Sequence, residues 1–114
     1  MKEALSEQLS KWAEQRAQRL QLGDDLEQAR EVDHAVVFRT KSHAAAAARS
    51  FEAAGFAVVV HSRLWKTTVE ASRSETLTEE NVARFLGEAL GIAEANGGAY
   101  DGFGGMIVPR VHEG

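Results

Sequence analysis

VDHAVVFR, Val32–Arg39, is the stretch of the chain that decides the expected fold. It is rich in β-branched and aromatic residues, which favour strands, and its alternation puts every second side chain on one face. The residues on that face are Val32, His34, Val36 and Phe38. We therefore predict that this stretch forms the first strand of a sheet, with the adjacent Asp33 on the opposite face.

Helices are predicted before and after this strand. Residues 1–22 carry alternating charges and an apolar stripe, which indicates an amphipathic N-terminal helix. Residues 41–55, KSHAAAAARSFEAAG, contain an alanine run and place Ser42 as the expected N-cap of a second helix. The clearest helical stripe covers residues 82–95, with Thr78 as its expected cap.

Further strands are predicted between and after these helices. Two stretches have the composition that is typical of strands: FAVVVHSR, residues 56–63, and LWKTTVEAS, residues 64–72. In the second stretch apolar and polar residues alternate, so we expect one of its faces to be exposed to solvent. Their connection lacks the Asn-Gly or Asp-Gly signal of a tight hairpin, so their register stays open. MIVP, residues 106–109, is the predicted last strand, which Pro109 would end.

The order of these elements predicts an α+β fold of the ferredoxin-like βαββαβ type. In this fold an antiparallel four-stranded sheet carries two helices on one face, and an N-terminal amphipathic helix is added here. The last strand would lie at an edge of the sheet, beside the first strand. The expected organisation is an N-terminal helix at residues 1–22, a ferredoxin-like domain at residues 23–110 and a short tail at residues 111–114.

Composition excludes several classes of function. The 114 residues carry 13 Lys and Arg against 17 Asp and Glu, and the resulting formal charge of −4 disfavours direct binding of nucleic acid. No apolar run is long enough to span a membrane, and the charged start does not resemble a signal peptide, so we expect a cytoplasmic protein with no membrane partner. The chain has no cysteine, which removes thiolate metal sites and cysteine nucleophiles.

The glycine-rich stretch GGAYDGFGG, Gly97–Gly105, matches no phosphate-binding motif. It lacks the third glycine of a dinucleotide fingerprint and the lysine of a P-loop. One interpretation is structural: Gly97 ends a helix, and the later glycines mark a bulge or a flattened edge strand. The other interpretation is functional: an edge strand with little side-chain cover lets Tyr100 and Phe103 protrude toward a protein partner.

Candidate metal and catalytic sites are weak. The histidines are His34, His43, His61 and His112. They have no metal-ligand spacing, and we expect neither a metal nor another cofactor. Asp33 and His34 point to opposite faces of their strand and cannot form a dyad. The remaining enzyme hypothesis centres on Asp101, Tyr100 and His34 in a small pocket, whereas a structural hydrogen bond between Asp101 and His34 is the simpler alternative.

Two motifs resemble the regulator of ribonuclease E activity B family, the RraB domain. They are GDDLEQAREVDHAVVFR, Gly23–Arg39, and the glycine-rich stretch Gly97–Gly105. The resemblance covers roughly residues 23–108. Its most specific part is Tyr100–Gly104, where family members often carry tryptophan at the position of Phe103.

The resemblance implies a ferredoxin-like domain that is not an enzyme. It implies a regulator that binds ribonuclease E and reduces its activity, and the acidic balance of the chain fits a basic region of such a partner. The residues that we assign to the partner surface are Tyr100, Asp101, Gly102, Phe103, Trp65 and His34. The alternative is a structural or self-associating domain without a ribonuclease target, for example a homodimer formed through Trp12.

Overall fold

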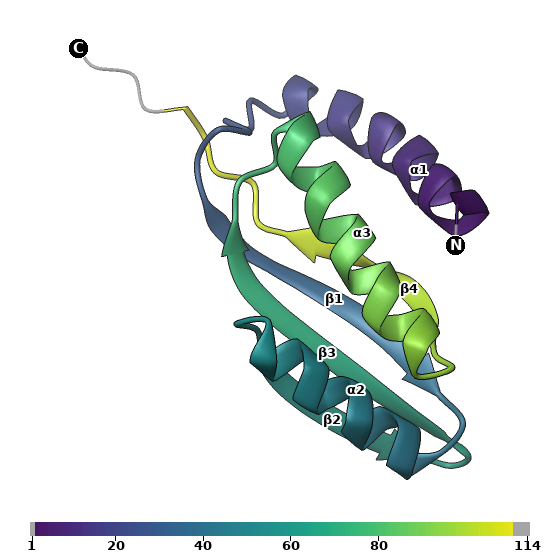
Figure 1. Ribbon diagram of the computed structural model, residues 1–114. Coiled ribbons are helices and arrows are strands. Elements are labelled where there is room, and N and C mark those ends of the chain that lie inside the picture. The colour runs from purple at the N-terminus through teal and green to yellow at the C-terminus, as the bar shows by residue number, and fades with distance from the viewer. Residues whose placement is uncertain (1, 111–114) are drawn as a thin grey trace.

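An antiparallel four-stranded sheet and three α-helices form the computed structural model, which describes residues 2–110 (Figure 1). The elements are α1 (Lys2–Gln21), β1 (Arg30–Phe38), α2 (Lys41–Ala53), β2 (Ala57–Arg63), β3 (Lys66–Glu75), α3 (Glu79–Ala95) and β4 (Ala99–Gly105). The strand order is β2-β3-β1-β4, so β1 is a central strand and β4 lies at an edge beside it. The predicted tail, residues 111–114, lies outside the described residues.

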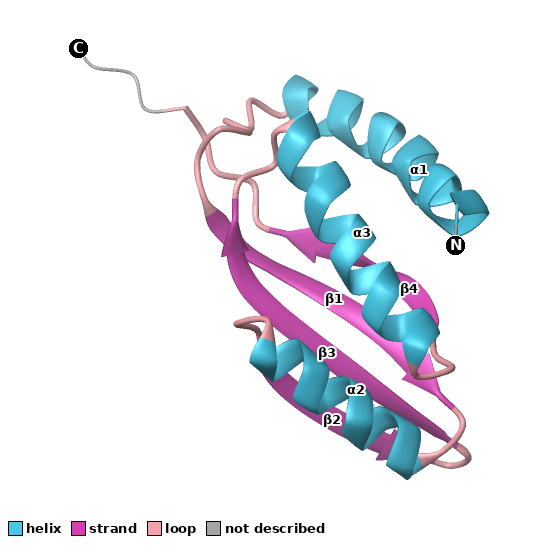
Figure 2. Cartoon of the chain, viewed as in Figure 1, coloured by secondary structure: helices cyan, strands magenta, loops and turns pink. Residues whose placement is uncertain are grey.

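The helices lie on one face of the sheet (Figure 2). Helix α2 packs on β2 and β3, whereas α1 packs along α3 near β4. The side chains of β1 alternate between buried and more exposed positions along the strand, as its sequence predicts. No helix among residues 2–110 covers the other face, which we call the open face. No helix in this described part is both long and apolar enough to cross a membrane.

Local sequence signals set most element ends. The predicted cap Thr78 is confirmed, because its hydroxyl accepts a hydrogen bond from the Asn81 backbone N–H at 3.2 Å. The prediction of Ser42 as the cap of α2 is wrong: Thr40 caps this helix and accepts from the His43 N–H at 3.2 Å. Thr40 precedes the first helical residue and is extended, which is the backbone conformation that an N-cap requires.

The hairpin between β2 and β3 has a two-residue turn despite its unusual sequence. Arg63 pairs with Lys66, so Leu64 and Trp65 form the turn. Leu64 adopts a left-handed φ of 59°, the conformation that glycine or asparagine usually supplies in such turns. The register that the sequence left open is therefore set, and Trp65 lies at the tip rather than inside β3.

The prediction of a last strand at residues 106–109 is wrong. The glycine-rich stretch itself forms the strand, β4, and the chain leaves the sheet after Gly105. Beyond it, the Val108 N–H donates to Oδ1 of the buried Asp24 at 3.0 Å, and Pro109 forms an isolated bridge with the same residue. The segment after β4 is therefore held by the buried carboxylate of Asp24 and not by pairing with a neighbouring strand.

Two hydrophobic clusters fill the space between the sheet and the helices. The first lies under α2 and includes Phe38, Phe51 and Phe56. The second joins Trp12 of α1 to Phe85 of α3, with Tyr100 and Phe103 of β4 packed against it. Trp12 is only 4% exposed, so it covers this domain and is not available for the predicted homodimer contact.

A buried ion triad ties α1 to the start of β1 and to the segment after β4. Asp24 accepts from Arg30 at 2.7 Å and from Arg19 at 3.0 Å, and all three residues are buried. Burial alone would raise the pKa of Asp24, but the hydrogen bonds from Arg30, the Val108 N–H and Arg19 outweigh it and hold this pKa below its usual value. The two guanidinium groups also donate to the Gly105 and Met106 carbonyls.

We expect Asp24→Asn to destabilise the fold by about 3 kcal/mol, because it leaves two buried guanidinium groups without their counter-charge. The free energy of unfolding in urea, followed by circular dichroism, measures this loss. Glu27→Gln removes an exposed carboxylate from the same loop and should stay within about 0.5 kcal/mol of the parent. Equal stability of the two variants would contradict a structural role for the triad.

Candidate functional site

A β-bulge in β4 explains much of the glycine-rich stretch. His34 pairs with Phe103 and Val36 with Tyr100, so two residues of β4, Asp101 and Gly102, lie opposite the single residue between them on β1. The extra residue puts both aromatic side chains of β4 on the helix-covered face. Gly102 has a φ of +138°, which side chains rarely tolerate. The structural interpretation of a bulged edge strand is therefore confirmed.

Two other glycines of the stretch have separate structural reasons. Gly97 follows the last turn of α3 with a left-handed φ of +69°, as predicted for a helix stop. At Gly98, a Cβ atom would overlap the ring of Phe38 and the side chain of Val36. The turn between α3 and β4 consequently needs glycine for close packing against β1.

The prediction that Tyr100 and Phe103 protrude is wrong. Both are half-buried on the helix side of the sheet, where the Phe103 ring lies 5.9 Å from Trp12 and 5.1 Å from Phe85 between ring centroids. The Tyr100 hydroxyl lies 2.7 Å from Nδ1 of His34. The bulge causes this difference, because a regular strand would have placed these two aromatic residues on opposite faces.

The His34–Tyr100 pair is an interior hydrogen bond. His34 is 1% exposed, and among the described residues its Nε2 has no hydrogen-bond partner. Burial lowers the pKa of His34 to about 4, against the opposing effect of the Glu75 carboxylate. Burial also raises the pKa of Tyr100 above its usual value. Both groups are therefore neutral at pH 7, which suits packing rather than proton transfer.

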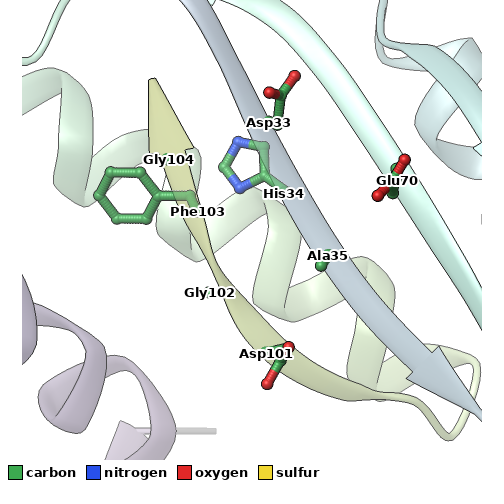
Figure 3. Close-up of a pocket in the computed structure, with 8 residues that line it drawn as sticks. All are labelled: Asp33, His34, Ala35, Glu70, Asp101, Gly102, Phe103 and Gly104. Carbon is green, nitrogen blue, oxygen red and sulfur yellow. The ribbon is translucent and has the colours of Figure 1, made fainter. Parts of the chain in front are cut away.

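The trio of the enzyme hypothesis is split between the two faces of the sheet. Tyr100 and His34 lie together on the helix side. Asp101 is exposed and lies beside the open face (Figure 3). Asp33 and His34 also point to opposite faces, as predicted; Asp33 accepts from the Ser72 hydroxyl at 2.6 Å. No group of three or more histidines or carboxylates within residues 2–110 could hold a metal ion.

The open face carries a shallow depression of about 260 Å³ beside β4 (Figure 3). Three carboxylates surround it, one each from β1, β3 and β4: Asp33, Glu70 and Asp101. Its floor is made of residues with little or no side chain: Ala35, Gly102 and Gly104. We call these six residues the acidic depression. The arrangement offers negative charge around a surface that a partner backbone or an extended cationic side chain can approach closely.

Trp65 lies apart from this depression, at the tip of the β2–β3 hairpin. It is 80% exposed, and its neighbour Leu64 is 84% exposed. A groove beside it is lined by Val37 and Arg39 at the end of β1 and by residues 97–99, where β4 begins. The six predicted partner-binding residues thus occupy three places: the interior cluster of His34, Tyr100 and Phe103, the bulge with Asp101 and Gly102, and the tip with Trp65.

Sequence reasoning missed Asp33 and Glu70 as neighbours of Asp101. Alternation placed both on the wet sides of their strands, but only the register of β1 with β3, which pairs Ala35 with Glu70, brings them together. The pairing of β4 with β1 then places Asp101 beside the same depression. Without the register, the sequence could therefore show that each carboxylate is exposed, but it could not show that the three carboxylates lie close together.

The bulge predicts different effects of two neighbouring glycine substitutions. Gly102→Ala should destabilise the protein by about 1–2 kcal/mol, because an L residue is strained at a φ of +138°. Gly104→Ala is the matched control on the same strand. A Cβ atom at either glycine would meet no other atom within 4 Å, but Gly104 has no positive φ, so its substitution should change the free energy of unfolding by less than about 0.5 kcal/mol. Equal losses in thermal or urea unfolding would contradict the role of the bulge.

The buried histidine predicts a pH dependence of stability. The folded-state pKa of His34, about 4, lies below its unfolded value near 6.5, so the unfolded chain binds the extra proton first. The stabilisation is complete above pH 6.5 and is lost as the pH falls toward 4, by up to about 3 kcal/mol. Urea unfolding at pH 7 and at pH 5 should show a smaller pH effect in His34→Gln. The exposed control His61→Gln should retain the full effect, and a parent-like slope in His34→Gln would contradict this assignment.

Comparison with known proteins identifies the family. The family model described as Regulator of ribonuclease activity B, RraB, matches residues 13–105, which is well over half of the chain and includes every strand of the sheet. No curated protein gives a significant match. The family match starts within α1, just after the buried Trp12, and ends at the last residue of β4. The chain belongs to the RraB family of regulators of ribonuclease activity.

Proposed function

We propose that this protein is a non-catalytic regulator that binds an endoribonuclease of the ribonuclease E type and lowers its activity. Family membership is the observation that carries the proposal. The split of the His34, Tyr100 and Asp101 side chains between two faces supports the non-catalytic part, because these groups cannot act together on one substrate. A regulator of RNA turnover would act in the cytoplasm.

The acidic depression is the surface that we assign to the ribonuclease. Its carboxylates Asp33, Glu70 and Asp101 are exposed, and its glycine and alanine floor leaves room for a partner chain. A basic segment of the enzyme would place a lysine or arginine among the carboxylates, with electrostatic attraction favouring rapid association. Asp101 and Gly102 of the predicted partner surface would then contact the enzyme directly.

The other predicted partner residues have supporting roles in this proposal. Tyr100 and Phe103 anchor the bulge from the helix side, and His34 fixes the Tyr100 hydroxyl. These residues would hold Asp101 in position without touching the enzyme. Trp65 would contact a partner only if the bound segment extended along the open face to the hairpin tip.

The proposal includes the ferredoxin-like form of the fold. The strand order β2-β3-β1-β4, the antiparallel pairing and the succession of one helix after β1 and another after β3 support it. In this form the helices occupy one face and leave the other free for a partner. Helix α1 is an addition on the helix side, so it would not compete for the open face.

Neutralising the depression tests the proposed surface. In titration calorimetry with a purified ribonuclease of this type, Glu70→Gln/Asp101→Asn should bind at least about tenfold more weakly than the parent, a loss of about 1.4 kcal/mol. Inhibition of RNA cleavage should weaken in parallel, and raising the salt concentration should reduce the difference between the proteins.

A second double variant controls for net charge. Glu27→Gln/Glu80→Gln removes the same two negative charges from exposed positions outside the depression and should bind like the parent. Equal losses in both variants would assign the effect to overall charge and not to this surface. Absence of binding and inhibition by the parent protein would overturn the proposed function itself.

A further inference from the structure

The turn between β2 and β3 has a sequence that the turn itself does not favour. Leu64 holds a left-handed φ of 59°, a conformation that favours glycine or asparagine and strains a larger side chain. Its side chain is 84% exposed, and that of Trp65 beside it is 80% exposed. Two-residue hairpin turns usually carry glycine, asparagine or aspartate, which avoid both the backbone strain and the exposed apolar surface. The stability of the turn therefore does not explain two large apolar side chains at this position.

Cationic residues lie on both sides of this turn. Arg63 pairs directly with Lys66 across the hairpin, and Phe38 pairs with Thr67, so Arg39 follows on the other side of Lys66. We call these three exposed cations, Arg39, Arg63 and Lys66, the basic row. Like charges on opposed residues of neighbouring strands repel each other, and none of the three forms an ion pair within residues 2–110. The basic row, like the turn, is therefore unfavourable for the isolated protein.

The turn and the basic row lie at the end of the sheet where β1 leads into α2 (Figure 1). Lys41, the first residue of α2, adds a fourth exposed cation at this end. No carboxylate of the described chain lines the groove beside Trp65. Along β3 the first carboxylate is Glu70, four residues after Lys66 and thus about 13 Å away. This end of the molecule is therefore rich in positive charge, although the whole chain has a formal charge of −4.

The combination of apolar and cationic residues limits the kind of partner that fits. The partner must offer an apolar environment to Leu64 and Trp65 and negative charge around them. A membrane with anionic lipids offers both, because its headgroups lie directly above its acyl chains. Tryptophan is favoured at this boundary, and lysine and arginine reach the headgroups with their charged ends. A single-stranded nucleic acid would stack on the tryptophan but would give the leucine no apolar environment.

We propose that the tip of the β2–β3 hairpin docks the protein peripherally onto a membrane surface that contains anionic lipids. Leu64 and Trp65 would enter the boundary between headgroups and acyl chains, and the basic row and Lys41 would contact the lipid phosphates. Such a contact needs no spanning segment, so the sequence-based expectation of no membrane partner, which rested on the absence of a long apolar run, does not bear on it. Two apolar side chains and four cations make a small contact, so binding should be reversible and should weaken as salt is raised.

Docking by the hairpin tip would leave the acidic depression free. Glu70 belongs to this depression, and its separation of about 13 Å from Lys66 exceeds the electrostatic screening length of about 8 Å at physiological salt. Repulsion between the depression and anionic lipids is therefore largely screened. Membrane docking goes beyond the proposed ribonuclease binding and does not require it. A docked regulator would present the depression to an enzyme near the membrane surface.

Co-sedimentation with lipid vesicles tests the contact. At a salt concentration of about 0.1 M, the parent protein should sediment with vesicles of phosphatidylcholine and phosphatidylglycerol at a ratio of about three to one. It should bind vesicles of phosphatidylcholine alone much more weakly. Trp65 is also a spectroscopic probe, because it is exposed whereas Trp12 is only 4% exposed. Binding should therefore shift the emission of Trp65, and not that of Trp12, to shorter wavelengths.

Two double variants separate the apolar tip from the basic row. Leu64→Gly/Trp65→Asn supplies residue types that favour a turn with a positive φ at its first position, so this variant should fold. Its binding to the anionic vesicles should fall at least about tenfold, and its emission should not shift. Arg63→Gln/Lys66→Gln should weaken binding to these vesicles about twentyfold, because each cation near an anionic surface contributes about fivefold.

A matched control and a second ligand complete the experiment. Lys11→Gln/Arg49→Gln removes two exposed positive charges elsewhere and should bind like the parent, and circular dichroism checks that every variant is folded. A parent that does not sediment with the anionic vesicles, or a tip variant that binds them like the parent, would overturn the proposal. Binding of a single-stranded oligouridylate or an acidic peptide without vesicle binding would also overturn it and would assign the tip to that partner. Ribonuclease binding is measured without vesicles, and its absence would count only against the proposed function.

Discussion

The buried carboxylate of Asp24 is the constraint on which much of the structure depends. It holds Arg19 at the end of α1 and Arg30 at the start of β1, and it receives the Val108 N–H from the segment after β4. Three parts of the chain that are distant in sequence therefore meet at one charge. Removing a single partner would leave the remaining charges buried without a counter-charge. The loss of stability would therefore be larger than for an exposed ion pair.

This triad sets the position of α1, and α1 in turn covers the aromatic side chains of β4. With Arg19 fixed, α1 runs along α3, and Trp12 reaches the Phe103 ring. The bulge at Gly102 turns Tyr100 to the same side, where His34 accepts or donates the hydrogen bond to its hydroxyl. The aromatic residues of the glycine-rich stretch therefore serve the interior, and only its small and acidic residues reach the open face.

Local sequence signals predicted the elements well, and their failures have physical causes. The strand at residues 32–39 and the cap Thr78 could be predicted because both depend on neighbouring residues alone. The prediction misplaced the last strand, because the hydrogen bond between the Val108 N–H and Asp24 joins residues that are 84 positions apart in the sequence. The side of the sheet that Phe103 faces was also unpredictable, since it depends on one extra residue in the pairing with β1. The three carboxylates of the acidic depression could not be grouped from the sequence either, because their grouping depends on how β1 pairs with β3 and β4.

The charge pattern of the open face follows from how the chain divides its residues between two faces. The fully buried apolar side chains of β1 point to the helices, so the positions between them were free to carry charge. Along that strand the charge changes from Glu31 and Asp33 to Arg39, and β3 changes in the opposite chain direction from Lys66 to Glu70. Antiparallel pairing aligns these two gradients side by side. A single strand of this kind would be weakly polar, whereas the paired strands give the open face one basic and one acidic part.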